Sequence, residues 1–315
     1  FITVYFEFSN PKKSKELEVG FEAYSAEGDA DQKPVNGRHP YISSFTVNMN
    51  GASIPHKVTI VGDTAYYKNG KFKAKTVAQA IKEAEETDYI AFFYVYHFRA
   101  PFKEGINIIQ HTYTVDLSIS VATMYELHYV LTAAMRWGNR QIDDFTLQID
   151  MGNFQDVCIP ATFFSDVAEW QLSGEGKSIQ VSAGGFKSAD TAEFFVRKGM
   201  IIYQKKNFKP TGELTLCSNS FSWYLATAEI TGEPFDSQRD PLPFAIESQE
   251  SFTEAKNDLS KRILKNLPFA RRGYVFKSAE LQSYFEKQKW YAKDTNYKAG
   301  LASLTAEEQA WVNKW

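Results

Sequence analysis

Short runs of β type recur from residue 1 to about residue 243 and constrain the fold more than any other feature of the chain. Val, Ile, Phe, Tyr and Thr dominate these runs, and turn-forming pieces such as Asn48-Met-Asn-Gly51 and Lys68-Asn-Gly70 separate them. The runs are 2–8, 17–24, 42–49, 57–60, 89–98, 106–121, 125–133, 145–149, 179–181, 192–195, 199–204, 214–216 and 220–228. Many short strands at this spacing predict an antiparallel β-sandwich body, with two sandwich-like units, rather than parallel βαβ winding.

The hydrophobic period changes to that of a helix in two places. Residues 76–87 carry Ala, Ile and Val on one side and charges opposite, which predicts one helix inside the β region. Apolar residues then recur at three- and four-residue steps from Phe252 to Arg272, where Gly273 can supply a left-handed C-cap. The C-terminal part of the chain is therefore predicted to be helical.

Two further helices are predicted near the C-terminus. One starts at a plausible N-cap, Ser278, and one at Thr305-Ala-Glu-Glu308, which fits the Thr-x-x-Glu capping box. A strip rich in Pro, Asp, Ser and Gln at 232–250 favours extended chain and marks a domain boundary. We expect three parts, namely a first β-sandwich-like part at 1–75, a second β-rich part with one helix at 76–243, and a small helical domain at 244–315.

Composition and charge exclude several classes of protein. The chain holds 6 Trp, 17 Tyr and 25 Phe in 315 residues, which is too rich in aromatic residues for global disorder. With 35 Lys and Arg against 38 Asp and Glu, it lacks the basic field that attracts nucleic acid. No apolar stretch reaches the roughly 18 to 20 residues of a membrane span. Nucleic-acid binding and a membrane span within the chain are therefore not expected.

The charges are unevenly distributed. Residues 251–315 hold 12 Lys and Arg against 7 Asp and Glu, and the rest of the chain holds 23 against 31. The net charge is therefore +5 in the tail and −8 in the body. Two interpretations stay open, ordinary solvated helix faces or a basic tail that attracts the acidic body or an anionic partner.

The two cysteines, Cys158 and Cys217, are too few for a disulfide scaffold and match no metal-binding spacing. They are compatible with one bridge or with two buried thiols. Both lie in apolar segments, where a buried thiol is ordinary, so this position favours thiols.

The C-terminal residues resemble a known family. Asn266-Leu-Pro-Phe-Ala-Arg-Arg-Gly-Tyr-Val-Phe276, followed by Leu281, Tyr284-Phe285 and Trp290-Tyr291, is similar to the YARHG domain. Phe269-Ala-Arg-Arg-Gly273 stands where that family has Tyr-Ala-Arg-His-Gly, so no role of a Tyr hydroxyl or His imidazole is carried over. The resemblance implies a small helical domain found in bacterial proteins outside the cytoplasm and often appended to other modules.

The β region is similar in style to uncharacterised envelope proteins of Bacteroidetes-like bacteria. The similarity rests on Tyr125-Glu-Leu-His-Tyr-Val-Leu131 followed by Trp137-Gly138. Phe1 begins in the middle of a strand pattern, which suggests an upstream leader or tether. We therefore expect an extracytoplasmic location, either periplasmic or on the outer cell surface.

The motif has a physical interpretation of its own. Tyr274 and Phe276 follow Gly273 as an extended piece, over which Phe285 and the Trp290-Tyr291 pair can close as a small core. Arg271 and Arg272 lie in the last helical turn, where a cation is favoured by the helix dipole. They either cap the helix and stack on Trp290 or Tyr291, or they bind an anion or carboxylate. The candidate ligand or partner contacts are Arg271, Arg272, Tyr274, Trp290 and Tyr291.

No recognisable catalytic or metal motif is present. The five histidines, His39, His56, His97, His111 and His128, are never within four residues of one another, which excludes His-x-His and His-Glu-x-x-His sites. His97 and His128 lie in predicted strands and could converge, although a histidine satisfied within a sheet is the simpler interpretation. Gly176-Lys-Ser178 lacks the rest of a phosphate loop, and Asp29-Ala-Asp31 lacks the glycine of a calcium loop.

Carboxylates and aromatic pairs give weaker indications. Glu22, Glu126, Asp143 and Asp144 fall near strands and could form an acid/base pair, as in any sandwich of this size. Aromatic neighbours occur at Tyr66-Tyr67, Phe92-Phe-Tyr94, Tyr96 and Trp223-Tyr224. Neighbouring residues of a strand point to opposite faces, so some of these rings either are exposed for binding or pack between sheets or domains.

The sequence therefore predicts a non-enzymatic binding or interaction module for a cell-envelope component or protein partner. No cofactor or metal is expected, and no catalytic residue is assigned. One alternative is a hydrolase acting on cell-wall or glycan material through carboxylates or a histidine. Another is a structural domain within an envelope assembly.

Overall fold

The computed structural model describes residues 1–26, 30–86, 92–117, 125–183, 189–218, 233–240, 242, 244–245 and 254–315. The chain forms two compact units. The first comprises Phe1–Ser118 with His128–Val130, and the second comprises Ile119–Leu127 with Leu131–Trp315. None of the helices in the described ranges is long and apolar enough to cross a bilayer.

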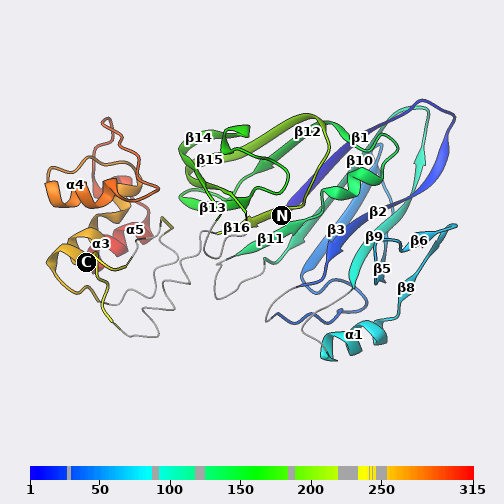
Figure 1. The fold of residues 1–315 in the computed structure, drawn as a ribbon, viewed down its shortest axis with the longest axis horizontal. Helices are drawn as coiled ribbons and strands as arrows, with labels where there is room; N and C mark the ends of the chain where they lie inside the picture. Colours follow the sequence, from blue (N-terminus) through cyan, green and yellow to red (C-terminus); the bar gives the residue numbers. More distant parts are fainter. Residues whose placement is uncertain are drawn as a thin grey trace. The chain divides into compact units, whose positions relative to one another are not determined.

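The first unit contains two antiparallel four-stranded sheets (Figure 1). One sheet has the order β1-β10-β3-β4, with strands β1 (Ile2–Asn10), β10 (Gly105–Val115), β3 (Ile42–Met49) and β4 (Ala52–Ser53). The other has the order β2-β9-β5-β8, with strands β2 (Lys15–Tyr24), β9 (Phe93–Phe102), β5 (Lys57–Val61) and β8 (Ala74–Lys75). A hairpin of β6 (Tyr67–Lys68) and β7 (Lys71–Phe72) and the helix α1 (Val77–Glu86) complete the unit.

The two sheets share one hydrophobic core. Tyr94, Tyr96 and Phe98 of β9 alternate along one face of their strand and pack with Phe45 and Ile109 of the other sheet. Successive side chains of a β-strand point to opposite faces, so alternate residues of β9 line one face of their sheet. That face packs against the other sheet, and the two antiparallel sheets therefore form a sandwich. The fold class expected from the sequence is therefore confirmed.

The aromatic neighbours on β9 are buried on both faces of their sheet. Phe93 and Val95 point away from the sandwich core and form a second small cluster with Val61 of β5. Tyr66 and Phe72, at the β6-β7 hairpin, pack against that cluster. These rings therefore pack together within the first unit. Trp223 and Tyr224 lie outside the described residues.

A six-stranded antiparallel sheet belongs to the second unit, except that His128 and Tyr129 of its strand β11 are grouped with the first unit. Its strand order is β11-β16-β13-β15-β12, and β14 pairs with the free side of β15. The strands are β11 (Glu126–Tyr129), β12 (Ile142–Ile149), β13 (Gln155–Pro160), β14 (Trp170–Val181), β15 (Thr191–Phe208) and β16 (Leu214–Cys217). Two 3₁₀ helices, η1 (Thr132–Arg136) and η2 (Val167–Glu169), connect strands. The predicted strand at 220–228 lies outside the described residues.

A glycine pair lets β15 run unbroken through 18 residues. Gly174 of β14 lies opposite Gly199 of β15. A Cβ on Gly199 would lie 2.1 Å from the Ser173 carbonyl oxygen, so the two backbones approach more closely than side chains permit. Two runs that the sequence separates, 192–195 and 199–204, are consequently one strand.

Cys158 of β13 and Cys217 of β16 form a disulfide. The two residues are register partners on adjacent strands, with their Cα atoms 5.0 Å apart. The sequence preference for buried thiols is therefore wrong. The apolar segments that suggested thiols are neighbouring strands of one sheet, and their register brings the sulfur atoms together.

The helical domain lies at the C-terminal end of the second unit, where Figure 1 draws α3, α4 and α5 as one group. It contains α3 (Asp258–Arg271), α4 (Ala279–Glu286), η4 (Leu301–Ser303) and α5 (Ala306–Lys314). The N-cap position of α4 is Ser278, and Thr305 and Glu308 form both bonds of the predicted capping box. The three predicted C-terminal helices are confirmed.

The three parts expected from the sequence differ from the two compact units. The sheet β2-β9-β5-β8 joins strands from both sides of residue 75, where one boundary was expected. The other expected boundary, after residue 243, lies among residues that the structure describes only in part. The three-part division stays a prediction about which segments fold independently.

Candidate functional site

The last turn of α3 is closed by backbone bonds that only a glycine permits easily. Gly273 has φ +81°, its N–H donates to the Ala270 carbonyl oxygen at 2.8 Å, and the Tyr274 N–H donates to the Phe269 carbonyl oxygen at 3.1 Å. This is the Schellman arrangement of a helix C-terminus. A Cβ at Gly273 would lie 2.3 Å from the Ala292 carbonyl oxygen. The predicted glycine cap is confirmed, and it also brings the segment after α4 against the end of α3.

Arg272 forms a two-pronged ion pair with Glu308. Arg272 Nη1 lies 2.6 Å from Glu308 Oε1, and Arg272 Nη2 lies 2.7 Å from Glu308 Oε2. The Glu308 residue is only 3% exposed, and its Oε2 also accepts the Thr305 N–H at 2.9 Å. The Glu308 carboxylate therefore caps the N-terminus of α5 and also pairs with Arg272 at the end of α3. Two parallel bonds of this kind fix the plane of the guanidinium.

Arg271 is buried against two aromatic rings. Its Cζ lies 4.5 Å from the centroid of Phe154 and 5.4 Å from that of Phe244. Its Nη2 donates to the Phe154 carbonyl oxygen at 3.3 Å, and its Nη1 lies 3.7 Å from Glu308 Oε1. Arg272 Cζ lies 4.3 Å from the same Phe154 centroid. Both guanidiniums thus converge on one ring within the range of a cation–π interaction.

The stacking partner of these arginines differs from the one expected. The sequence suggested Trp290 or Tyr291, which follow α4. The structure places Phe154 and Phe244 under the guanidiniums instead. Trp290 and Tyr291 instead pack against Phe285 of α4, and Trp290 Nε1 donates to the Leu242 carbonyl oxygen at 3.0 Å.

Phe154 lies between β12 and β13 in an uncommon backbone conformation. Its φ is +57°, in the left-handed region that bulky residues rarely occupy. The preceding turn is closed by the Gly152 N–H, which donates to Asp150 Oδ1 at 2.9 Å. The Phe154 N–H donates to the Arg197 carbonyl oxygen at 3.2 Å. A left-handed residue costs of order 1–3 kcal/mol and persists where its surroundings hold it.

Residues of β14 and β15 fasten the helical domain to the sheet. Arg197 donates from Nη1 to the Arg272 carbonyl oxygen and from Nη2 to the Ala292 carbonyl oxygen, both at 3.1 Å. Lys177 donates to the Tyr291 carbonyl oxygen at 3.3 Å. These cations donate hydrogen bonds to carbonyl oxygens at the C-terminal end of α3 and after α4. Positive charge at a helix C-terminus is favoured by the helix dipole. We call the contacts of Phe154, Lys177 and Arg197 with the helical domain the junction.

The aromatic residues after Gly273 form the small core that the sequence predicts. Phe276 and Phe285 stack with centroids 4.9 Å apart. The Tyr291 hydroxyl donates to the Tyr274 carbonyl oxygen at 2.8 Å, and burial raises the pKa of Tyr291. Trp290 and Tyr291 are each 6% exposed, and Tyr274 is partly buried against the same core. All five candidate contact residues thus lie together, at the junction or in this core.

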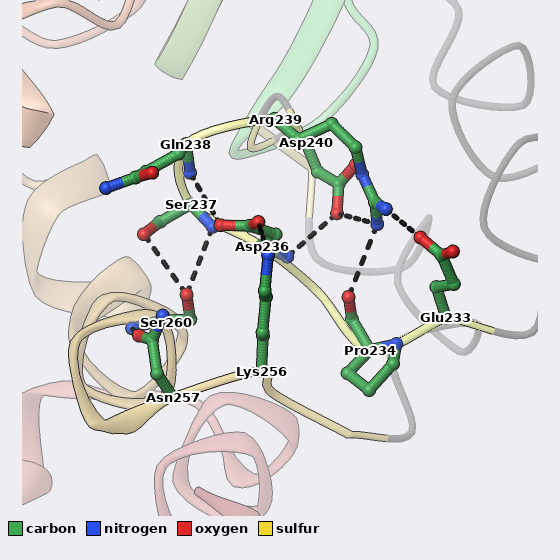
Figure 2. Close-up of polar contacts among 10 residues, drawn as sticks. All are labelled: Glu233, Pro234, Asp236, Ser237, Gln238, Arg239, Asp240, Lys256, Asn257 and Ser260. Carbon is green, nitrogen blue, oxygen red and sulfur yellow. Dashed lines mark hydrogen bonds and ion pairs between the residues drawn. The ribbon is translucent and has the colours of Figure 1, made fainter.

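Hydrogen bonds and an ion pair connect a polar loop to the start of α3 (Figure 2). Asp236 accepts the Gln238 N–H at 3.0 Å through Oδ1 and the Lys256 ammonium at 2.6 Å through Oδ2. The hydrogen bond from Lys256 lowers the pKa of Asp236. Ser260, fully buried in the first turn of α3, accepts the Ser237 N–H at 3.1 Å.

This loop also supplies hydrophobic residues to the helical core. Phe235, Leu242 and Phe244 are buried in the same cluster as Leu264 and Phe285. Figure 2 shows Arg239 directed at Asp240 and Glu233, with which it forms ion pairs, whereas Asp236 pairs with Lys256. The contacts drawn in Figure 2 therefore hold this loop against the start of the helical domain.

Other residues singled out from the sequence lie elsewhere. His97 is 7% exposed, and its ring nitrogens face Glu18 Oε1 at 2.5 Å and Thr59 Oγ1 at 3.0 Å. His97 is therefore satisfied within its sheet by these two residues rather than by convergence with His128. Asp143 and Asp144 are exposed on β12, where Gln141 donates to Asp143 and Lys206 pairs with Asp144.

No metal centre is formed by the described part of the chain. Within it, no group of three or more His, Cys, Asp or Glu side chains is arranged to hold an ion. Asp31 is exposed, and Asp29 lies outside the described residues.

Sequence reasoning missed Phe154, Arg197 and the pairing role of Glu308. Phe154 follows a polar turn and has no periodic signal, because its position depends on a left-handed φ that the residue type disfavours. Glu308 was recognised as half of a capping box, which gave no reason to pair it with Arg272. Only the fold brings these residues together.

Comparison with known proteins finds a family match at the C-terminal end of this sequence. Residues 247–315 match the family described as the YARHG domain, which confirms the resemblance at the C-terminus. No curated protein matches the chain. A crystal structure of a proposed nutrient-binding protein from Legionella pneumophila aligns over 99% of this chain and 85% of that one, with 16% identity and a TM-score of 0.43. Likeness at that level carries no argument about function.

Proposed function

We propose that the protein is an extracytoplasmic, non-enzymatic interaction module in which the helical domain presents a basic surface to an acidic cell-envelope component or protein partner. The C-terminal YARHG match supports the extracytoplasmic location. The proposal rests on a difference in the surroundings of the cations in this domain. The motif arginines are engaged within the chain, whereas two lysines of α3 are left facing solvent.

Lys261 and Lys265 provide that solvent-facing charge. They are four residues apart on α3, which places them on one face of the helix, and both are exposed. Neither forms an ion pair with any described residue. Together with the net charge of +5 over residues 251–315, they favour an acidic partner and a salt-sensitive association.

The experiment compares charge reversal on α3 with charge reversal elsewhere. The variant Lys261→Glu/Lys265→Glu is immobilised and used to capture partners from envelope extracts, beside wild type and the control Lys12→Glu/Lys13→Glu. Lys12 and Lys13 are exposed on the turn between β1 and β2. We expect the α3 variant to lose the salt-sensitive captured species and the control to retain it. Equal capture by all three proteins would refute the proposal.

Direct partner contact through Arg271, Arg272, Tyr274, Trp290 and Tyr291 stays a prediction. Arg271, Trp290 and Tyr291 are buried, and the other two are partly buried. Contact through the arginines would therefore require the junction to open. The exposed lysines need no such rearrangement.

A hydrolase is the second candidate, and one observation in the first unit favours it. Glu18, His97 and Thr59 form a chain of carboxylate, imidazole and hydroxyl across β2, β9 and β5. A carboxylate that orients an imidazole beside a hydroxyl is the arrangement that activates a nucleophile for acyl transfer. Thr59 would attack an ester or amide carbonyl while His97 accepts its proton and returns it to the leaving group as the bond to that group breaks. Water would then hydrolyse the acyl-threonine ester and regenerate the Thr59 hydroxyl.

The hydrolase candidate is tested by three variants of the hydroxyl and its base. Thr59→Ala and His97→Ala should abolish release of acyl or amide products from isolated cell-wall material, whereas Thr59→Ser should retain it. An absence of product release with wild type, or equal release by Thr59→Ala, would exclude this role for Thr59.

A further inference from the structure

The two motif arginines converge on a single aromatic side chain that belongs to a different part of the second unit. Arg271 Cζ lies 4.5 Å and Arg272 Cζ lies 4.3 Å from the centroid of Phe154. We propose that this arginine pair is a receptor for an aromatic residue at a tight turn, and that the chain fills the receptor with its own Phe154. The matching partner is therefore a peptide turn that ends in an aromatic residue.

The contacts recognise the backbone at this position as well as the ring. Arg271 Nη2 donates to the Phe154 carbonyl oxygen at 3.3 Å, and the Arg197 carbonyl oxygen accepts the Phe154 N–H at 3.2 Å. An aromatic ring with an accessible N–H and C=O beside it is the chemistry that this site accepts. An isolated aromatic side chain would make the contacts with the ring but not these two backbone hydrogen bonds.

Both arginines are also held by contacts that do not involve Phe154. Arg272 is fixed by its two bonds to Glu308 and by the Pro268 carbonyl oxygen, which accepts Arg272 Nη1 at 2.9 Å. Arg271 rests on Phe244 in addition to Phe154. Removal of the Phe154 ring therefore leaves two positioned guanidiniums.

The occupant is held in a conformation that it does not favour. Phe154 has φ +57°, and the turn before it runs from Asp150 through Gly152. A bulky residue in the left-handed region makes the intramolecular occupant easier to displace, because part of the contact energy is offset by backbone strain. An external turn with a relaxed backbone can compete for the same site.

The inference is independent of the basic surface proposed above, because Lys261 and Lys265 take no part in these contacts. The probe is a fluorescent peptide with the sequence of residues 148–156, Gln-Ile-Asp-Met-Gly-Asn-Phe-Gln-Asp, and its analogue with Ala in place of Phe. Both are titrated against the full chain as wild type, Phe154→Gly and Phe154→Leu. Phe154→Leu keeps apolar packing in place and removes the aromatic ring.

We expect at least a tenfold lower Kd for the Phe peptide with either variant than with wild type, and loss of that gain with the Ala peptide. Far-ultraviolet circular dichroism shows whether each variant is folded. Equal binding by wild type and variants, or equal binding of the two peptides, would overturn the inference. Unfolding of both variants would also overturn it, because Phe154 would then be a fixed core residue and not an exchangeable occupant.

Discussion

Arg272 and Glu308 join the end of α3 to the start of α5 through two N–H···O bonds of 2.6 and 2.7 Å. The two residues are 36 positions apart in the sequence, and the carboxylate is almost completely buried. A buried pair of this kind adds little relative to apolar residues of the same size, but loss of one member strands the other charge.

Substitution of Glu308 by Ala should therefore destabilise the helical domain by about 3–5 kcal/mol. The reason is that Arg272 loses its counter-charge and α5 loses half of its capping box. Urea unfolding followed by tryptophan fluorescence measures the effect. Glu307→Ala, which changes the exposed neighbour in the same turn, should shift the free energy of unfolding by less than about 0.5 kcal/mol. Similar losses for the two variants would contradict the role of the pair.

Gly273→Ala should also destabilise the domain, by roughly 1–3 kcal/mol. The added Cβ would meet the Ala292 carbonyl oxygen at 2.3 Å, and the residue has φ +81°. The matched control is Gly300→Ala, because a Cβ there has no neighbour within 4 Å. Thermal unfolding of both variants tests the difference, and an equal Tm for the two would show that the glycine cap is dispensable.

Removal of the disulfide should destabilise the sheet of the second unit. The bridge between Cys158 and Cys217 spans 59 residues, and the loss of chain entropy on closing a loop of that length corresponds to about 4 kcal/mol. Cys158→Ala/Cys217→Ala should unfold at lower denaturant concentration than wild type. Wild type under reducing conditions should shift in the same direction, whereas the double variant should not respond to reductant. Two free thiols in the oxidised, folded wild type would contradict the bridge.

The first unit should lose stability as the pH falls from about 6.5 to about 4. Burial lowers the pKa of His111 to about 4 and that of His39 to about 4, from the ordinary value of 6.5. Between those values the unfolded chain binds more protons than the folded one, so the free energy of unfolding decreases with decreasing pH. Each site contributes on the order of 3 kcal/mol to this decrease.

His111→Phe isolates the contribution of one site. The variant keeps a ring among Phe21, Phe45 and Tyr113 but has no group to titrate. Its free energy of unfolding should vary less with pH between 6.5 and 4 than that of wild type. Identical pH profiles for the two proteins would mean that His111 does not titrate in this way.

The sequence predicts those parts of the fold that depend on local pattern. Alternation predicts β9, and the Thr305-x-x-Glu308 spacing predicts the start of α5. Gly273 is predicted as a C-cap because few other residues tolerate a positive φ. In each case the residues that carry the signal are neighbours along the chain.

Features that depend on pairing between distant segments could not be predicted in the same way. Most of β14 is missed because Gly174, Gly176 and polar residues interrupt its pattern, and its register with β15 is what makes it a strand. The disulfide depends likewise on the register of β13 against β16. The candidate site has the same limitation, because the approach of Arg271 to Phe154 spans 117 positions and follows from the packing of the helical domain on the sheet.

The 36 positions between Arg272 and Glu308 have a consequence for the order in which the contacts of this domain form. A nascent polypeptide that has not yet reached residue 305 contains Arg272 but lacks the carboxylate that neutralises it. The nine residues of α5 are too short to be a stable helix alone, so this helix and its contact with α3 form together. Chains terminated before residue 305 would therefore keep an incomplete, protease-sensitive helical domain.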